Sequence, residues 1–179
     1  MIRLEPGDAE RYARLRLTML TLAPWAFSAT PEDDDALDFR RLAEMFADEH
    51  HATFAIEAAR SLSPAHHVER DSEGRAVLVA SASVTRAKSP KFRHRARIWG
   101  VFVEPGYRGR GLGKALMHAV IKEARSWRGV TFLDLSVSAN SPEAQRLYES
   151  FGFEVWGREP EATELDGRRY DEIHMSLRL

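Results

Sequence analysis

Val101-Phe-Val-Glu-Pro-Gly-Tyr-Arg-Gly-Arg-Gly-Leu-Gly-Lys114 is the most informative stretch of this chain. Before its glycines, the apolar run from Ile98 to Val103 is rich in β-branched and aromatic residues and predicts a buried strand. After them, apolar residues recur at spacings of three and four from Leu112 onward, which predicts a helix. The pattern is therefore a strand, a glycine-rich loop and a helix N-terminus.

This arrangement favours an anionic ligand. Glycine lets the backbone approach a ligand closely and adopt positive φ. The first N–H groups of a helix lack intrahelical acceptors and lie at the positive end of the helix dipole. Arg108, Arg110 and Lys114 add formal positive charge beside them. We therefore expect a phosphate or pyrophosphate group at this loop.

Two common phosphate-binding patterns are excluded. A nucleotide P-loop requires Gly-Lys-Ser/Thr preceded by a glycine, but Gly113-Lys114 is followed by Ala115, and Arg108 stands where the first glycine belongs. The dinucleotide pattern G-x-G-x-x-G fails because Lys114 replaces its third glycine.

What does match is Arg108-x-x-Gly111-x-Gly113, which resembles the pyrophosphate loop of the GNAT N-acetyltransferases. Downstream, Asn140-Ser-Pro-Glu-Ala-Gln-Arg-Leu-Tyr-Glu-Ser-Phe-Gly-Phe153 is similar to the second signature of that family. The two signatures together cover roughly residues 98 to 156. The resemblance implies the GNAT fold, a mixed α/β architecture with a central, mostly antiparallel twisted sheet flanked by helices. It also implies acetyl-CoA as cosubstrate.

The resemblance also assigns roles to particular residues. Tyr148 matches the tyrosine that faces the cofactor sulfur, and a phenol is suited to protonate a leaving thiolate; its other interpretation is a packed core tyrosine. Asn140 stands eight residues before Tyr148 where the family usually has seven, so either Asn140 or Ser141 contacts the cofactor. The predicted cofactor-binding residues are Val101, Phe102, Val103, Arg108, Gly109, Arg110, Gly111, Leu112, Gly113, Lys114, Asn140 and Ser141.

The general base and the acceptor pocket are less well defined. The position five before Asn140, where some family members carry a catalytic glutamate, is Leu135. Glu104 and His174 are our first candidates for the base, and Glu57, His94 and Asp134 are the others. Trp25 and Phe27 lie between the first two predicted helices, where they either shape the acceptor pocket or belong to the core.

Composition limits the alternatives. The chain of 179 residues has a hydrophobic fraction of 44%, which suits one domain over residues 1–179. A net charge of −1 gives no overall attraction to nucleic acid or membrane. The absence of cysteine excludes disulfides and thiolate sites, and we expect no metal, also at His66-His67. No signal region or apolar span is recognisable, so we expect a cytoplasmic protein without membrane contact.

Along the chain the predicted order is strand, two helices, three strands, helix, strand, helix and two strands. On the first helix, Arg11, Arg14 and Arg16 are predicted to lie mostly outside the apolar face. The second helix is predicted from a cap at Thr30 to about Asp48. The last two strands flank a turn at Asp166-Gly167.

The sequence therefore predicts an N-acetyltransferase that moves the acetyl group of acetyl-CoA directly to a primary amine of a small molecule or a protein. One alternative is a GNAT domain that binds acyl-CoA without turnover. Another, disfavoured, is a nucleic-acid-binding module that uses a basic turn from Arg86 to Arg97, with Phe92 for stacking. The resemblance also allows homodimer formation through an exposed strand edge.

Overall fold

The computed structural model describes residues 1–59 and 70–179, so His66-His67 lies outside the described residues. The element order agrees with the predicted order. The elements are β1 (Ile2–Arg3), α1 (Ala9–Leu22), α2 (Phe39–Phe46), β2 (His51–Glu57), β3 (Leu78–Arg86), β4 (Arg95–Val103), α3 (Leu112–Ser126), β5 (Phe132–Ser138), α4 (Pro142–Glu149), β6 (Glu154–Leu165) and β7 (Arg168–Arg178).

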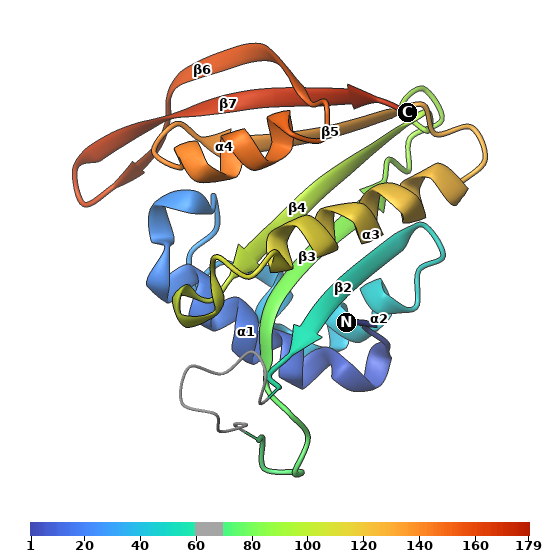
Figure 1. Ribbon diagram of the computed structural model, residues 1–179, viewed down its shortest axis with the longest axis vertical. Coiled ribbons are helices and arrows are strands. Elements are labelled where there is room, and N and C mark those ends of the chain that lie inside the picture. Colours follow the sequence, from blue (N-terminus) through green and yellow to red (C-terminus); the bar gives the residue numbers. More distant parts are fainter. Residues whose placement is uncertain (60–69) are drawn as a thin grey trace.

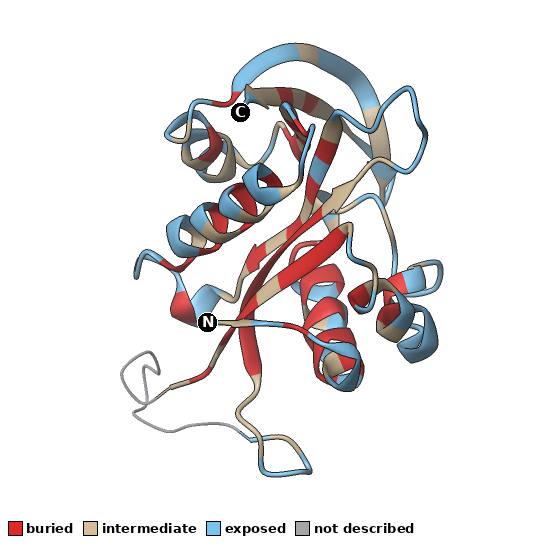
Figure 2. Ribbon diagram, turned by 90° about the vertical axis from the view of Figure 1, so that its right-hand side faces the viewer, coloured by how far each residue is buried: buried red, intermediate tan, exposed pale blue. Residues whose placement is uncertain are grey.

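In the described part of the chain, the strands form one sheet of seven strands in the order β1-β2-β3-β4-β5-β7-β6 (Figure 1). Every pair is antiparallel except β4 and β5, which are parallel. Helices α3 and α4 lie on one face, and α1 and α2 lie on the other (Figure 2). The predicted mixed, mostly antiparallel sheet flanked by helices is therefore confirmed.

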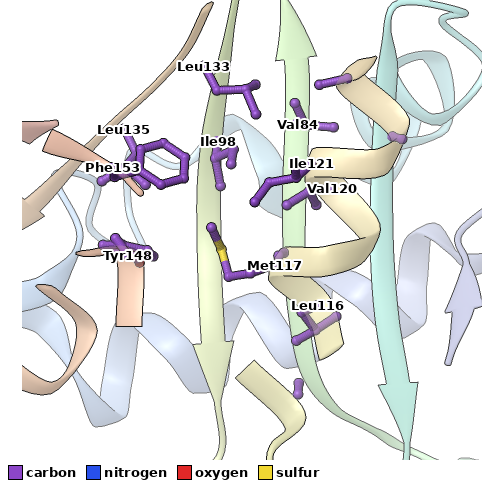
Figure 3. Close-up of a cluster of buried hydrophobic side chains, with 14 of the residues drawn as sticks. Val84, Ile98, Leu116, Met117, Val120, Ile121, Leu133, Leu135, Tyr148 and Phe153 are labelled. Atoms are coloured by element: carbon purple, nitrogen blue, oxygen red, sulfur yellow. The ribbon is translucent and has the colours of Figure 1, made fainter. Parts of the chain in front are cut away.

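The larger hydrophobic cluster lies under α3 and α4. Figure 3 shows Leu116, Met117 and Val120 of α3 directed toward the sheet, as their spacing of three and four residues requires. They pack with Val84 and Ile98 of the central strands. The opposite cluster, under α1 and α2, draws on β2, β3 and the end of β4 and includes no residue of β5, β6 or β7 among the described residues. That half of the sheet therefore has one face without a helix.

Strand β4 separates from β5 partway along its length. The two strands pair only from Arg95 to Arg97, opposite Phe132 to Asp134. Beyond this point Gly100, at φ +62°, introduces an irregularity in the pairing of β4 with β3. Such a bulge bends a strand and increases its twist. The C-terminal half of β4 therefore diverges from β5 and opens a gap between them.

The prediction that Arg11 and Arg16 lie outside the apolar face of α1 is wrong, because both are buried. The Arg11 guanidinium donates to Glu57 (2.6 Å) and Asp8 (2.8 Å). These carboxylates compensate the loss of hydration that burial causes. Arg14, which bonds Glu10 on the surface, is exposed as predicted.

The predicted second helix begins later than expected. Its N-cap is Asp38, whose carboxylate accepts from the backbone N–H groups of Arg40 and Arg41, and α2 starts at Phe39. Thr30 begins only a turn, which is followed by a short 3-10 helix at Asp35–Leu37. Because Asp38 satisfies the first N–H groups of the helix, the earlier start at Thr30 is wrong.

The basic segment from Arg86 to Arg97 is also not a turn throughout. Strand β3 extends to Arg86 and β4 begins at Arg95, so only residues 87–94 connect them. The predicted hairpin at Asp166-Gly167 is confirmed, with φ of +50° and +71° at these two residues.

Within residues 1–59 and 70–179, no helix has the length and apolar character needed to cross a membrane.

Candidate active site

A cavity of about 480 Å³ lies where β4 and β5 diverge. The end of β4, the glycine-rich loop, α4 and the segment after α1 surround it. Its lining includes most of the predicted site residues, namely Val101, Phe102, Val103, Arg108, Gly109, Gly111, Leu112, Gly113, Asn140, Ser141 and Tyr148. Arg110 and Lys114 do not line it and are exposed at its margin.

The glycine-rich loop has the backbone that its sequence predicts. Gly109 and Gly111 both have φ of +76°, a conformation that side chains disfavour. Gly111 is the N-cap of α3, and the first intrahelical bond runs from the Ala115 N–H to the Gly111 carbonyl (3.0 Å). The N–H groups before Ala115 in α3 therefore have no intrahelical acceptor. They form a donor cluster that suits a pyrophosphate.

Gly113 has a different role from the other two glycines. It lies in the first turn of α3, where a Cβ would approach Leu147 Cδ2 of α4 to 3.2 Å. Its small size therefore allows α3 and α4 to pack closely beside the cavity.

The end of β4 turns backbone groups toward the cavity. The Glu104 N–H donates to the Val79 carbonyl on β3 (2.9 Å). Because successive residues of a strand direct their N–H and C=O groups to opposite sides, those of Val103 point away from β3, toward the gap. The Arg108 side chain, from its Nε, donates to the Val103 carbonyl (2.9 Å) and fixes the start of the loop against the strand.

Tyr148 stands between this cavity and a second one. Its side chain lines both cavities and is only 5% exposed. Its ring packs against Phe153 with the centroids 6.2 Å apart. Burial raises the pKa of the Tyr148 phenol well above its usual range. Because no described residue hydrogen-bonds its hydroxyl, this group remains a neutral donor available to a ligand.

The second cavity, of about 340 Å³, adjoins the first and is called here the acceptor cavity. Phe27, Val101 and Tyr148 line both. Trp25 lines the first cavity, so both aromatic residues singled out in the sequence border the site. The buried Arg16 guanidinium lies 4.9 Å from the centre of the Phe27 ring and forms a 2.6 Å ion pair with Asp34.

Neither of our first two candidates for the base lines the acceptor cavity. His174 borders a different groove and bonds Glu159 (3.1 Å), whereas Glu104 lines neither cavity. Glu172 is the acidic residue that does line it. Glu172 forms no ion pair with another described residue. The sequence could have pointed to Glu172, because it stands two residues before the candidate His174 and alternate residues of a strand share a face.

The other three candidates are also accounted for. Glu57 pairs with Arg11 (2.6 Å), and Asp134 forms a bidentate pair with Arg95. His94 is exposed in the β3–β4 connection, against the ring of Phe132. None of the three lines the acceptor cavity.

A buried hydrogen-bond network supports the floor of the acceptor cavity. Trp99 lines this cavity, and its indole N–H donates to Thr85 Oγ1 (3.0 Å). Thr85 contacts His51 Nδ1 (2.8 Å), and His51 Nε2 contacts Thr53 Oγ1 (2.8 Å), which in turn reaches Ser83. Burial lowers the pKa of His51 to about 4, so it is neutral at pH 7. The network therefore fixes the Trp99 ring without a buried charge.

Glu159, Glu172 and His174 offer ligand atoms within 4.8 Å of one another. Glu159 pairs with Glu172 across β6 and β7, and the exposed Glu159 already bonds His174. Such a cross-strand cluster is also an ordinary surface arrangement, and the expectation that the protein needs no metal stays a prediction.

The model of the acetyltransferase (GNAT) family matches residues 20–153 of this chain. The chain belongs to the GNAT family. The resemblance inferred from the two sequence signatures is thereby confirmed.

Two relatives from Escherichia coli K12 illustrate the range of the family. The chain is 41% identical over 83 residues to the [ribosomal protein bS18]-alanine N-acetyltransferase. The matched stretch covers 46% of this chain and 55% of the relative. The chain is 25% identical over 99 residues to the L-amino acid N-acetyltransferase AaaT, covering 55% and 60%. This chain thus spans about half the length of the relatives that it matches.

Solved structures share the whole fold. A GNAT acetyltransferase from Streptococcus pneumoniae superposes with a TM-score of 0.79 at 18% identity, covering 99% of this chain and 98% of that one. Arabidopsis thaliana NAA60 in complex with acetyl-CoA gives a TM-score of 0.71 at 19% identity, with 99% and 97% covered. At these identities the likeness shows the fold alone.

Proposed function

We propose that this GNAT chain is an acetyl-CoA-dependent N-acetyltransferase that moves the acetyl group directly to a primary amine. The observation that carries the proposal is the gap between β4 and β5. It brings the positive-φ glycines, the Val103 backbone and Tyr148 to the lining of one cavity.

The residues around the gap suit the parts of acetyl-CoA. The N–H groups at the start of α3 hold the pyrophosphate, with Arg108, Arg110 and Lys114 supplying charge. The backbone of Val103 and, by the same alternation, that of Val101 bonds the pantetheine arm, which fills the place of the missing β5 partner. Phe102 directs its backbone groups toward β3 and lines the cavity beside the arm. Asn140 and Ser141 both line the cavity, and either reaches the cofactor. This arrangement brings the thioester close to Tyr148.

The chemistry then requires removal of two protons from the acceptor nitrogen and protonation of the leaving thiolate. Glu172 accepts a proton from the ammonium form of the acceptor, because an alkyl amine is almost wholly charged at neutral pH. The free amine attacks the thioester carbon, which forms the amide bond and breaks the carbon–sulfur bond. The Val103 N–H polarises the carbonyl oxygen. Tyr148 donates its phenolic proton to the departing thiolate, so that CoA leaves as a thiol. The amide nitrogen then loses its extra proton, which restores the Tyr148 phenol, and Glu172 releases its proton to solvent.

The acceptor that we propose carries an α-amino group. The two relatives from Escherichia coli are named for acetylating an alanine of a ribosomal protein and L-amino acids, and both classes share that group. Tyr148 lines both the acceptor cavity and the cavity beside the glycine-rich loop, which supports entry of the amine there.

The test is to incubate the protein with acetyl-CoA and a panel of L-amino acids, amino-acid amides and short peptides. Mass spectrometry then detects each acetylated product, and a thiol reagent measures CoA release. We expect N-acetylated product and CoA in equal amounts. CoA release without an acetylated amine, or no reaction with any member of the panel, would overturn the proposal.

A further inference from the structure

A further cavity, of about 730 Å³, adjoins the acceptor cavity. It lies on the open face of the sheet, over the paired part of β4 and β5, and is called here the β4–β5 groove. It shares Arg97, Trp99 and Ser136 with the acceptor cavity. A ligand whose amine enters the acceptor cavity can therefore extend into the groove.

We propose that this groove binds the residues that follow the acceptor amine of an acidic polypeptide. The inference rests on the proposed function and deepens it. The groove follows β4 from Trp99 back to Arg95 and ends at the β3–β4 connection. The four steps from Arg95 to Trp99 span roughly 13 Å, which is the length of about four extended residues of a bound peptide.

Aromatic side chains line the groove along its length. Trp99 lies at the acceptor end, Phe92 lies at the far end, and Trp156 borders one side. Trp156 is 64% exposed, and its ring stacks on His174 with the centroids 5.2 Å apart. Phe92 is 57% exposed. Large aromatic side chains held in fixed orientations are the usual anchors of polypeptide ligands.

The charges in the groove favour acidic ligands. Arg95 is neutralised by its pair with Asp134. Arg97 instead donates to the Ser136 hydroxyl (2.9 Å) and forms no ion pair with a residue in the described ranges 1–59 and 70–179. Arg97 thus lacks a carboxylate partner, which an acidic side chain of the ligand would supply.

The first measurement compares acceptors of two lengths, a pentapeptide and a single amino acid. The probes are pentapeptide amides Xaa-Glu-Leu-Glu-Phe, with every residue except proline at the first position, and the amides of the same single amino acids. We expect kcat/KM for the best pentapeptide to exceed that for its amino-acid amide by at least about ten-fold. Replacing both glutamates by lysine should remove most of this advantage.

Matched variants then locate the effect. In the Trp156→Ala and Arg97→Gln variants, the ratio of kcat/KM for the pentapeptide to kcat/KM for the amide should fall close to one. Val155→Ala is the control for Trp156→Ala, because Val155 is 50% exposed and pairs with Met175 across the strands. Both residues lie on the face of the sheet that is away from the groove. Arg93→Gln is the control for Arg97→Gln, because Arg93 is exposed and does not line the groove. Both controls should keep the wild-type ratio.

The outcomes separate the inference from the function beneath it. Equal rates for pentapeptides and amides would overturn the groove assignment while leaving the acetyltransferase proposal intact. Acetylation of no amine at all would overturn both. A single-stranded RNA oligomer that binds wild type but not Trp156→Ala, together with no effect of peptide length, would assign the groove to nucleic acid instead.

Discussion

Replacing Tyr148 by Phe should separate catalysis from folding more sharply than any other single change. The substitution removes one hydroxyl and keeps the ring that packs against Phe153. Because no described residue hydrogen-bonds this hydroxyl, no buried partner is left unsatisfied. We therefore expect the free energy of unfolding to change by no more than about 1 kcal/mol.

The expected effect on the rate is much larger. A general acid typically contributes 10²- to 10⁴-fold, so kcat should fall by at least about a hundred-fold, or about 2.7 kcal/mol in activation free energy. Because burial raises the pKa of Tyr148, the phenol stays protonated throughout the range below pH 10. Its ionisation should therefore cause no loss of rate in that range.

The assay follows CoA release with the best acceptor of the panel, together with urea unfolding. Tyr170→Phe is the matched control, because Tyr170 is half-buried on β7 and lines none of the cavities around Tyr148. A Tyr148→Phe enzyme whose kcat stays within about two-fold of wild type would refute the assignment of Tyr148 as the acid. A large loss of stability would show that the residue acts mainly through packing.

Three further predictions concern His51, Gly100 and Glu172. The pKa of His51 is about 4 in the folded chain and near 6.5 in the unfolded one, so the unfolded state binds its proton first as the pH falls. Between pH 8 and 5 the free energy of unfolding should fall by about 2 kcal/mol, and a urea titration of His51→Gln should lack this component. Gly100→Ala should destabilise the fold by about 1–3 kcal/mol, seen as a lower Tm in calorimetry, because its Cβ would lie 3.1 Å from the Tyr12 hydroxyl at φ +62°. Glu172→Gln should lower kcat about a hundred-fold while acetyl-CoA affinity is kept; an unchanged kcat would exclude Glu172 as the base.

Local sequence rules predicted the backbone of the glycine-rich loop and of its flanking strand and helix. The positive φ of Gly109 and Gly111 follows from residue type and spacing, because glycine tolerates this backbone and other residues resist it. The buried strand before the loop and the amphipathic α3 after it follow from hydrophobic periodicity. These features depend on neighbours in the sequence, which is why the sequence alone revealed them.

The acceptor side depends on contacts between distant parts of the chain. Arg16 is buried because Asp34, eighteen residues away, pairs with it, and no periodicity signals such a partner. Glu172 reaches the acceptor cavity only because β7 pairs with β5 in a particular register, with Ser138 opposite Glu172. A shift of one residue would turn its side chain to the other face of the sheet.

The central claim is tested most directly by calorimetric titration of acetyl-CoA into the wild type, Gly111→Asp and Gly111→Asn. Asp and Asn both tolerate the left-handed backbone at this N-cap, so the pair separates the effect of charge from that of conformation. We expect wild type to bind acetyl-CoA and not ATP, with a gain of about 2.7 kcal/mol in stability at a hundred times Kd. Gly111→Asp should lose binding, and Gly111→Asn should retain more of it. A folded wild type that binds no CoA species, or a Gly111→Asp variant that binds as tightly as wild type, would contradict the claim that this loop holds acetyl-CoA.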